Sequence, residues 1–250
     1  MNNSEKIRPI HPFAARMAPE IAFEALKGLK KGGTILDPMS GSGTVLKTIS
    51  ERGFKGVGYD IDPLAVLMTK AWTANINALK FLKVSRKILH EARHTRMSDI
   101  YLPWIDDDRD TLDFINFWFG HQQINMLRKL SFVLSQRRGH YADLAKIALS
   151  RLIITKAKGA SLAADISHSR PHRVRDTNDF DVFLNYEKVS ERLAKLYPES
   201  AASDQVMVHQ GDARKLRNID DDSIHAIITS PPYLNALDYM RGHKLSLVWL

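Results

Sequence analysis

The feature that most constrains the fold is a short apolar segment that ends in a carboxylate and runs into a glycine-rich turn. Residues 34–37, Thr-Ile-Leu-Asp, have the character of a buried strand. Gly41 and Gly43 follow and allow a sharp turn whose backbone can approach a ligand closely. A helix is predicted directly after the turn, over about 44–52. The segment therefore predicts a strand–turn–helix unit with free N–H groups at the start of its helix.

The same order recurs further along the chain. A second strand is predicted at 56–60 and ends in Asp60, and Asp62-Pro63 is predicted to open a long helix toward His90. An amphipathic helix at 19–29 precedes the first strand. Alternation of strands and helices is typical of a parallel sheet with crossover helices, so the sequence predicts an α/β fold.

The middle of the chain departs from this alternation, and we predict a mainly helical, basic insertion over 91–200. Residues 112–158 are mostly helical in pattern, with breaks at Gly120 and Gly139. The other predicted segments of the insertion are a solvated loop at 106–108, a loop rich in hydrogen-bond donors at 162–177 and an amphipathic helix at 179–197.

The sheet is predicted to resume after the insertion. Strands are expected at 205–209 and 224–229, and the second runs into Ser230-Pro231-Pro232-Tyr233. The predicted division is a cofactor-binding half at 1–90, the insertion at 91–200 and the rest of the sheet domain, with the catalytic motif, at 201–250. Residues 234–250 end on an apolar run that would need cover, so a second chain that completes the sheet is a further expectation.

Composition excludes several kinds of chemistry. The chain has no cysteine, which rules out disulfides and thiolate metal sites. It also rules out methylation at C5 of a pyrimidine by the usual thiolate addition. The sequence shows no apolar run of the roughly 18 residues that a membrane span needs, and the first 16 residues are polar, so a cytoplasmic protein is expected.

The glycine-rich turn indicates an adenosine-containing cofactor. Asp37 at the strand tip would repel a pyrophosphate but suits the ammonium group of a methionine moiety. Asp60 can accept both ribose hydroxyls, and Asp212, after the third strand, can accept from the adenine amino group. A nicotinamide fingerprint would have a third glycine where Leu46 stands. The alternative is an ordinary tight turn.

The second motif is Ser230-Pro231-Pro232-Tyr233 at the end of an apolar strand. Two consecutive prolines must stop the strand and fix the direction of the Pro231 carbonyl. The amino nitrogen of a base is a poor nucleophile because its lone pair is delocalised into the ring. A hydroxyl and a carbonyl that accept its two hydrogens would free the lone pair to attack a sulfonium methyl, while Tyr233 stacks on the base. A structural Pro-Pro loop is the alternative.

Together the two motifs resemble those of the N4-cytosine/N6-adenine DNA methyltransferases of restriction–modification systems. The cofactor motif of that family, Asp-Pro-Phe-x-Gly-x-Gly-Thr, is matched from Asp37 to Thr44 except for Met39. Its catalytic motif, (Asp/Asn/Ser)-Pro-Pro-(Tyr/Phe), is matched from Ser230 to Tyr233, and Thr-Ser-Pro-Pro-Tyr resembles the N4-cytosine, or TSPPY, subgroup. The segment from His11 to Met17 resembles the one that packs against the methionine end of the cofactor.

The resemblance covers roughly residues 1–75 and 204–250. It implies a Rossmann-like S-adenosylmethionine-dependent methyltransferase sheet with a mainly helical insertion, lacking the C-terminal strands. It also implies that the enzyme methylates DNA, with S-adenosylmethionine as cofactor. The expected catalytic residues are Ser230, Pro231, Pro232 and Tyr233, and the expected cofactor-binding residues are His11, Pro12, Asp37, Pro38, Ser40, Gly41, Gly43, Thr44, Asp60, Ile61, Asp212 and Ala213.

Charge indicates where DNA would bind. Between residues 120 and 175 the chain has eleven lysines and arginines but two acids. The net charge of this segment, 11 − 2 = +9, exceeds the whole-chain net charge of +8. We expect this insertion to contact DNA phosphates, with Arg170, His172, Arg173 and Arg175 as candidate residues; a solvated helical face is the alternative. His168 and His172 are four residues apart, but Pro171 between them argues against a helical metal site, so no metal is expected.

Three functions remain open at this stage. The leading interpretation is a DNA amino-methyltransferase that favours cytosine N4. An N6-adenine DNA enzyme or an RNA base N-methyltransferase could use the same chemistry. An incomplete or split subunit that binds DNA or a partner without activity of its own is the non-enzymatic alternative.

Overall fold

The computed structural model describes residues 7–13, 16–153, 155, 158–164, 171–197, 205–232 and 239–250. The chain separates into two compact units. Residues 1–75 and 199–237 form the first, which we call the sheet unit, and residues 76–198 and 238–250 form the second, which we call the helical unit. No helix among the described residues is long and apolar enough to cross a membrane.

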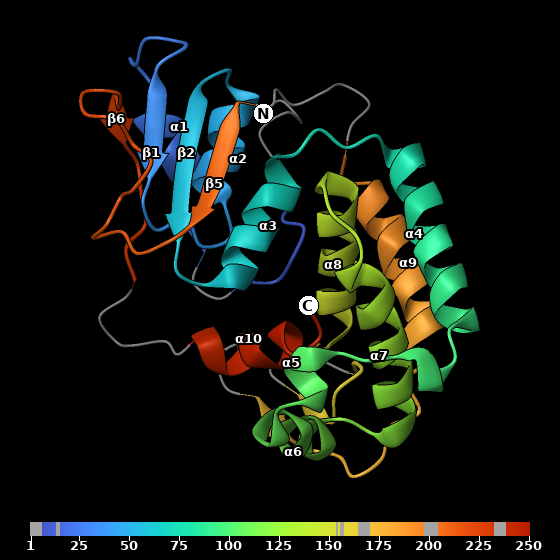
Figure 1. Cartoon of the computed structure of the whole chain (residues 1–250). Coiled ribbons are helices and arrows are strands. Elements are labelled where there is room, and N and C mark those ends of the chain that lie inside the picture. The colour runs from blue at the N-terminus through green and yellow to red at the C-terminus, as the bar shows by residue number, and fades with distance from the viewer. Residues whose placement is uncertain are drawn as a thin grey trace. The chain divides into compact units, whose positions relative to one another are not determined.

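The sheet unit contains a four-stranded parallel sheet in the order β5-β2-β1-β6 (Figure 1). Its strands are β1 (Thr34–Asp37), β2 (Lys55–Asp60), β5 (Val206–Gln210) and β6 (Ala226–Ile227). Leu36 pairs with Val57 of β2 on one side and with Ile227 of β6 on the other. The expected α/β class with a parallel sheet is therefore confirmed.

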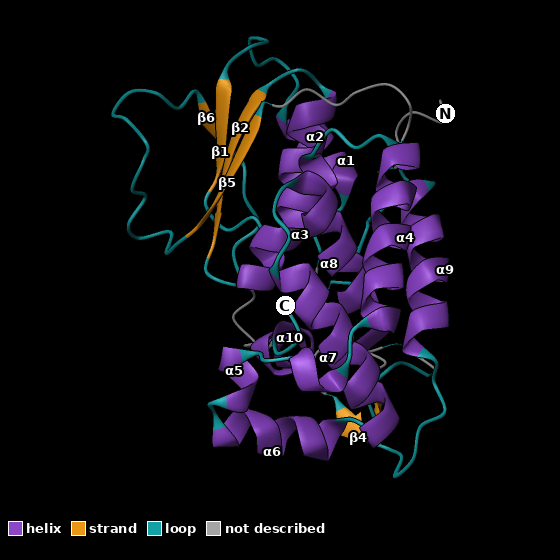
Figure 2. Ribbon diagram, turned by 45° about the vertical axis from the view of Figure 1, so that its right-hand side comes forward, coloured by secondary structure: helices purple, strands orange, loops and turns teal. Residues whose placement is uncertain are grey.

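Three helices cover one face of this sheet. They are α1 (Pro19–Ala25), α2 (Thr44–Glu51) and α3 (Pro63–Thr73), and Figure 2 shows all three on the same side of the strands. The core between these two layers is apolar and includes Ala22, Leu26, Ile35, Val45, Leu46, Ile49, Phe54, Val66, Val208 and Ile228. Burial of these side chains is the main stabilising contribution that holds the strand ends in place.

The opposite face of the sheet is covered by a loop. Leu36, Val57 and Tyr59 are buried there, and apolar side chains of the segment 211–225 pack against them. Tyr59 donates its hydroxyl hydrogen to the Arg217 carbonyl, which fastens this loop to β2.

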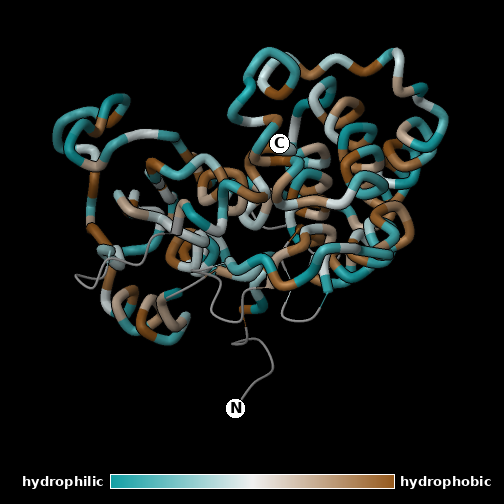
Figure 3. Tube along the Cα trace, turned by 90° about the horizontal axis from the view of Figure 1, so that it is seen from below, coloured by the Kyte–Doolittle hydropathy of each residue, from teal (hydrophilic) through white to brown (hydrophobic). Residues whose placement is uncertain are grey.

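The helical unit is built mainly from long amphipathic helices, and Figure 3 shows the alternation of apolar and polar residues along them. Its helices are α4 (Ala78–His94), the short η2 (Met97–Asp99), α5 (Pro103–Asp106), α6 (Arg109–Trp118), α7 (His121–Ser135), α8 (His140–Ile153), α9 (Val182–Ala194) and α10 (Tyr239–Leu247). α4 packs against α7, α8 and α9. The predicted breaks at Gly120 and Gly139 are confirmed, as is the helix expected within 179–197.

Several predicted elements differ from the structure. The single helix expected from Pro63 toward His90 is wrong: α3 ends at Thr73, and Ala74 is extended. Asn77 then caps α4 by accepting from Lys80 N at 2.9 Å, so its side chain starts a new helix. The strand expected at 224–229 is shorter, although Ile228 N still donates to Leu36 O at 3.0 Å.

The described part of the donor-rich loop expected at 162–177 contains a short antiparallel pair of strands. β3 (Ala163–Ala164) pairs with β4 (His172–Arg173). A two-residue strand offers too little periodicity to be seen in a sequence.

Candidate active site

The described residues of both motifs lie at one edge of the sheet. The four strands are parallel, so their carboxyl ends point the same way, which is where open α/β sheets bind ligands. Asp37 ends β1, Asp60 ends β2, Asp212 follows β5, and Ser230 follows β6 by three residues. Residues nearly 200 positions apart in the chain are thereby brought together.

Asp37 is buried, with 1% of its surface exposed. Its Oδ1 accepts a hydrogen bond from Thr229 Oγ1 at 2.7 Å and one from Met39 N at 3.3 Å. Burial raises the pKa of Asp37 to about 7, the two hydrogen bonds work against that rise, and the nearby Asp60 adds to it. Near neutral pH this carboxyl therefore changes charge readily, and a cation placed beside it would favour the ionised form.

Asp60 holds the glycine turn. Its Oδ2 accepts from Gly41 N at 2.7 Å and its Oδ1 accepts from Asp62 N at 2.9 Å. The two bonds engage both oxygens of this carboxylate, which was expected to accept the ribose hydroxyls of a cofactor. The ribose-binding role remains a prediction. The structure shows a second role for Asp60 that the sequence did not reveal, because its hydrogen bond from Gly41 N holds the glycine turn in place.

The two glycines of the turn are constrained in different ways. Gly43 has φ of 84°, and a Cβ there would lie 2.7 Å from Thr69 Oγ1 of α3. A Cβ at Gly41 would reach the ring of Phe13 at 3.4 Å, so the N-terminal segment lies over the turn. Close approach therefore requires the glycine at 43, whereas at 41 it is the left-handed backbone, with φ of 50°, that favours glycine.

The turn also has the features of a ligand site. Ser40 is 6% exposed, and its buried Oγ has no hydrogen-bond partner. Buried polar atoms of this kind are rare in native structures and call for a partner. Ile61, just beyond Asp60, is an apolar side chain that is 72% exposed. An orphaned hydroxyl and an uncovered apolar side chain fit a ligand with polar and flat apolar parts.

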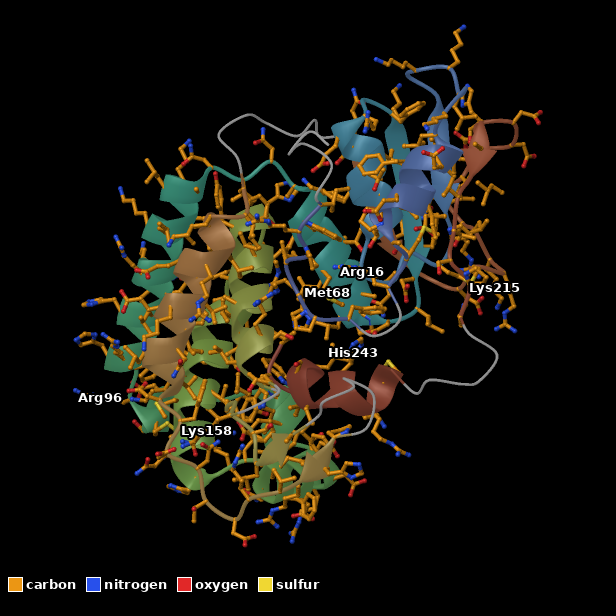
Figure 4. All side chains as sticks on the ribbon, turned by 180° about the vertical axis from the view of Figure 1, so that it is seen from behind. Arg16, Met68, Arg96, Lys158, Lys215 and His243 are labelled. Atoms are coloured by element: carbon orange, nitrogen blue, oxygen red, sulfur yellow. The ribbon has the colours of Figure 1, made fainter. Side chains whose placement is uncertain are left out.

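The carboxylate of Asp212 is hydrogen-bonded to Arg214. Arg214 Nε lies 3.0 Å from each of its carboxylate oxygens, and Arg214 N donates to Oδ1 at 2.9 Å. These hydrogen bonds hold the pKa of Asp212 at about 2. Adenine would have to displace the guanidinium to reach this carboxylate. Lys215, on the same loop, is labelled in Figure 4.

The remaining expected residues are placed as follows. Ser230 is half-buried and Pro231 and Pro232 are exposed, while Tyr233 lies outside the described residues. His11 Nδ1 lies 2.6 Å from the Pro12 carbonyl oxygen. Pro38 and Ala213 are half-buried, and Thr44 is buried at the start of α2. Within the described residues, no group of three or more histidines, aspartates and glutamates could hold a metal ion.

Three cations of the basic segment are paired with acids from other parts of the chain. Arg128 Nη2 lies 2.8 Å from Asp106 Oδ1, Arg137 pairs with Glu91, and Lys158 pairs with Asp179. The partner acids all come from outside residues 120–175. Asp106 was expected in a solvated loop, which is wrong, because it ends α5 and is held by Arg128.

The candidate DNA-contacting residues are placed only in part. His172 and Arg173 lie exposed on β4, and Arg175 is half-buried. Arg173 lies over the ring of Phe117, 5.1 Å from its centroid, and Nη2 is 3.5 Å from Asp176. Arg170 lies outside the described residues. Arg96 and Lys158 are other cations of the helical unit that are labelled in Figure 4.

No protein-family model matches the sequence, but three curated proteins are similar to it. Type II methyltransferase M.BsoBI of Geobacillus stearothermophilus is 23% identical over 248 positions, which cover 89% of this chain and 48% of that protein. Type II methyltransferase M.MvaI of Kocuria varians is 23% identical over 283 positions, which cover 100% of this chain and 58% of that protein. Type II methyltransferase M.MjaII of Methanocaldococcus jannaschii is 28% identical over 91 positions, covering 36% and 17%.

The chain is therefore similar to type II methyltransferases, at 23% identity over most of its length. The resemblance inferred from the two motifs is thereby confirmed. The chain spans about half the length of the two relatives that match most of it.

Two residues of this site were not assigned a role from sequence. Thr229 lies in the catalytic motif, so its position was visible, but its hydrogen bond to Asp37 depends on the pairing of β6 with β1. Thr69 donates to Gly41 O at 3.3 Å from α3. No sequence signal distinguishes it from other residues of a buried helix.

Proposed function

We propose that this chain carries the catalytic centre of a DNA methyltransferase that transfers a methyl group from S-adenosylmethionine to the exocyclic amino group of a base, with cytosine N4 as the preferred position. The observation that supports this most is the 2.7 Å hydrogen bond from Thr229 to Asp37, because it brings the catalytic motif to the cofactor motif. Kinship with type II methyltransferases supports the same reaction.

The residues of the glycine turn would hold the cofactor. Asp37 would face its ammonium group, Asp60 its ribose and Ser40 a polar atom of its methionine part. Bound there, S-adenosylmethionine would supply an electrophilic methyl group on a sulfonium sulfur. Phe13 and Ile61 would exclude water from its two sides.

Ser230 and the Pro231 carbonyl would hold the base. Each would accept one hydrogen of the amino group, which favours a tetrahedral nitrogen and localises its lone pair. The localised lone pair would then be available to the methyl group that S-adenosylmethionine supplies, with the thioether as leaving group and the extra amino proton passing to solvent. Tyr233 would stack on the base, as enzymes that act on extruded bases require.

The reaction is tested with the chain as it stands. Labelled S-adenosylmethionine is incubated with the protein and either duplex DNA or total tRNA, and the DNA is digested to nucleosides for mass spectrometry. N4-methyldeoxycytidine is the expected product, with turnover reduced by at least about 100-fold in Ser230→Ala. Label found only in tRNA would contradict the choice of DNA, and N6-methyldeoxyadenosine would contradict the choice of base.

A partner that completes the sheet remains a prediction from the sequence. Ile227 on β6 and Met207 on β5 are 63% and 60% exposed, which is compatible with further cover. If such a chain is needed, the protein alone should bind S-adenosylmethionine in calorimetry without methylating DNA. A monomer on sizing that is fully active alone would argue against a partner.

A further inference from the structure

The helical unit contains two open hollows that share Trp104 and Leu247. The first, of about 350 Å³, is lined by Phe114, Asp110, Thr111 and Lys244 beside the shared residues. The second, of about 540 Å³, is lined by Ser135, Arg138 and Lys146. α5, which carries Trp104, and α10, which carries Lys244 and Leu247, lie side by side in Figures 1 and 2.

Trp104 stands between the hollows in a fixed position. Its Nε1 donates to the Val248 carbonyl at 3.1 Å, just beyond α10, while 39% of the side chain stays exposed. The helix that carries it is held by Asp106, which accepts from Leu102 N at 2.7 Å and pairs with Arg128. An indole that is oriented and partly exposed is a stacking surface rather than core.

The first hollow suits a flat heterocycle. Trp104 and Phe114 are its aromatic walls, and its polar groups are few. A nucleic-acid base has a π face that can stack on the aromatic walls. It also has N–H groups that can donate hydrogen bonds to Asp110. Lys244 can donate to a ring nitrogen or carbonyl oxygen.

The second hollow suits an anion. Arg138 Nη1 donates to the Ser135 and Arg137 carbonyls at 2.5 and 2.9 Å, which aims the guanidinium from the end of α7. Lys146 of α8 is half-buried near this cation, and burial together with Arg138 lowers its pKa, although Asp143 works against the shift. Two cations at one hollow repel each other, and a bound phosphate would offset that repulsion.

These two cations differ from others of the same unit. Arg128, Arg137 and Lys158 each face an acid, so their charge is already balanced. Arg138 and Lys146 line the second hollow, next to the aromatic one, and the acid that acts on Lys146 is Asp143 of the same helix. A nucleotide has both complementary parts: an anionic phosphate and, one sugar away, a flat base.

We propose that these hollows bind one nucleotide, with the base between Trp104 and Phe114 and the phosphate at Arg138 and Lys146. The nucleotide is either free or part of a single-stranded nucleic acid. The inference does not rest on methyl transfer and is tested without S-adenosylmethionine.

The test titrates the full chain with AMP, GMP, CMP, inorganic phosphate and a short single-stranded DNA. Calorimetry gives the affinity, and tryptophan fluorescence reports stacking. The chain has four tryptophans, so loss of the quenching in Trp104→Phe would locate the signal, while the phenyl ring retains most of the affinity. Nucleotides should bind more tightly than inorganic phosphate because only they fill both hollows.

Matched variants separate the two parts. Trp104→Ala should weaken nucleotide binding about tenfold and leave phosphate binding unchanged, with Phe117→Ala, another exposed aromatic, as control. Arg138→Ala with Lys146→Ala should weaken both ligands about tenfold, with Lys83→Ala and Lys87→Ala on α4 as the control pair. Far-ultraviolet circular dichroism checks the fold of each.

Three outcomes would overturn the proposal. They are the absence of nucleotide binding at millimolar concentration, equal losses in the control variants, and phosphate binding as tight as nucleotide binding. The first of these includes the case in which single-stranded DNA binds but no mononucleotide does. If mononucleotides bind and the strand does not, the ligand is a free nucleotide.

Discussion

Thr229 donates its hydroxyl hydrogen to Asp37 Oδ1 across 2.7 Å, which joins the last residue of β1 to the residue before Ser230. The bond is possible because β6 runs parallel to β1, with Leu36 opposite Ile227. Cofactor motif and catalytic motif are therefore held together by one side-chain contact as well as by the sheet.

We predict that Thr229→Val shifts the pH dependence of S-adenosylmethionine binding upward. The Thr229 hydrogen bond lowers the pKa of Asp37, which burial raises to about 7. Without that bond the pKa rises further, so a higher pH is needed before the carboxylate can face the cofactor ammonium. Calorimetric affinity between pH 6 and 8.5 measures the midpoint. Thr229→Ser keeps the hydroxyl and should behave as wild type; an unchanged midpoint in Thr229→Val would show that Asp37 does not face the cation.

Asp37 should also make the protein less stable as the pH rises toward neutrality. Its pKa is raised from the usual 3.8 to about 7 in the folded state. Between these values the folded state binds more protons, so the free energy of unfolding falls as pH rises and levels off above about 7. Asp37→Asn should remove up to about 4 kcal/mol of this dependence. Urea unfolding from pH 4.5 to 8 measures it, and an identical slope in the variant would contradict the buried carboxyl.

The sequence predicted those parts of the site that depend on local chemistry. The two glycines, the strand-end carboxylates and the Pro-Pro stop are local requirements, and all of those described lie at one sheet edge. The parts that it missed depend on tertiary contacts. The helical pattern in the sequence looks continuous through Asn77, but the Asn77 side chain bonds to the backbone and starts a new helix there.

Sequence reasoning about charge missed the ion pairs of the basic segment. A count along residues 120–175 cannot see that Asp106, Glu91 and Asp179 come from other segments to pair with its cations. Similarly, Asp212 could be assigned to adenine, but its pairing with Arg214 depends on the turn after β5. Spacing predicts which groups are available, whereas the fold decides which of them are already engaged.

We predict that Arg214→Ala tightens S-adenosylmethionine binding. The guanidinium contacts both oxygens of Asp212, so the adenine amino group must compete with it. The pair is exposed, and exposed ion pairs are weak, so the gain should not exceed about fivefold. Calorimetry measures it, and Lys215→Ala on the same loop is the control. Weaker binding in Arg214→Ala would instead make Arg214 a cofactor contact.

Arg128 should contribute to the stability of the helical unit. Its side chain and that of Asp106 are 14% and 23% exposed. Burial alone would raise the pKa of Asp106, but hydrogen bonds from Arg128 and Leu102 N outweigh it and lower the pKa. Arg128→Met leaves this carboxylate partly buried without its partner and should cost about 2 kcal/mol.

Two controls accompany the Arg128 prediction. Arg109→Met breaks a pair with Asp113 whose side chains are 86% and 63% exposed, and should cost less than about 0.5 kcal/mol. A depressed carboxyl pKa stabilises the fold above its unfolded value near 4, and the contribution is lost as pH falls through the folded pKa. The Arg128→Met deficit measured by urea unfolding should therefore shrink at low pH, and a deficit that is constant with pH would contradict the ion pair.

Gly58 in β2 and Leu46 in α2 should be coupled in stability. A Cβ at Gly58 would overlap Leu46 Cδ1, and Leu46 is fully buried in the core beneath the glycine turn. Gly58→Ala should therefore destabilise the protein by about 1–3 kcal/mol through overpacking, and Leu46→Ala by about 2–5 kcal/mol through a cavity. In the double variant the alanine at 58 enters the space that Leu46 vacates, so its loss should be smaller than the sum of the two. Urea unfolding of the four proteins gives the coupling energy; strictly additive losses would show that the two residues do not touch.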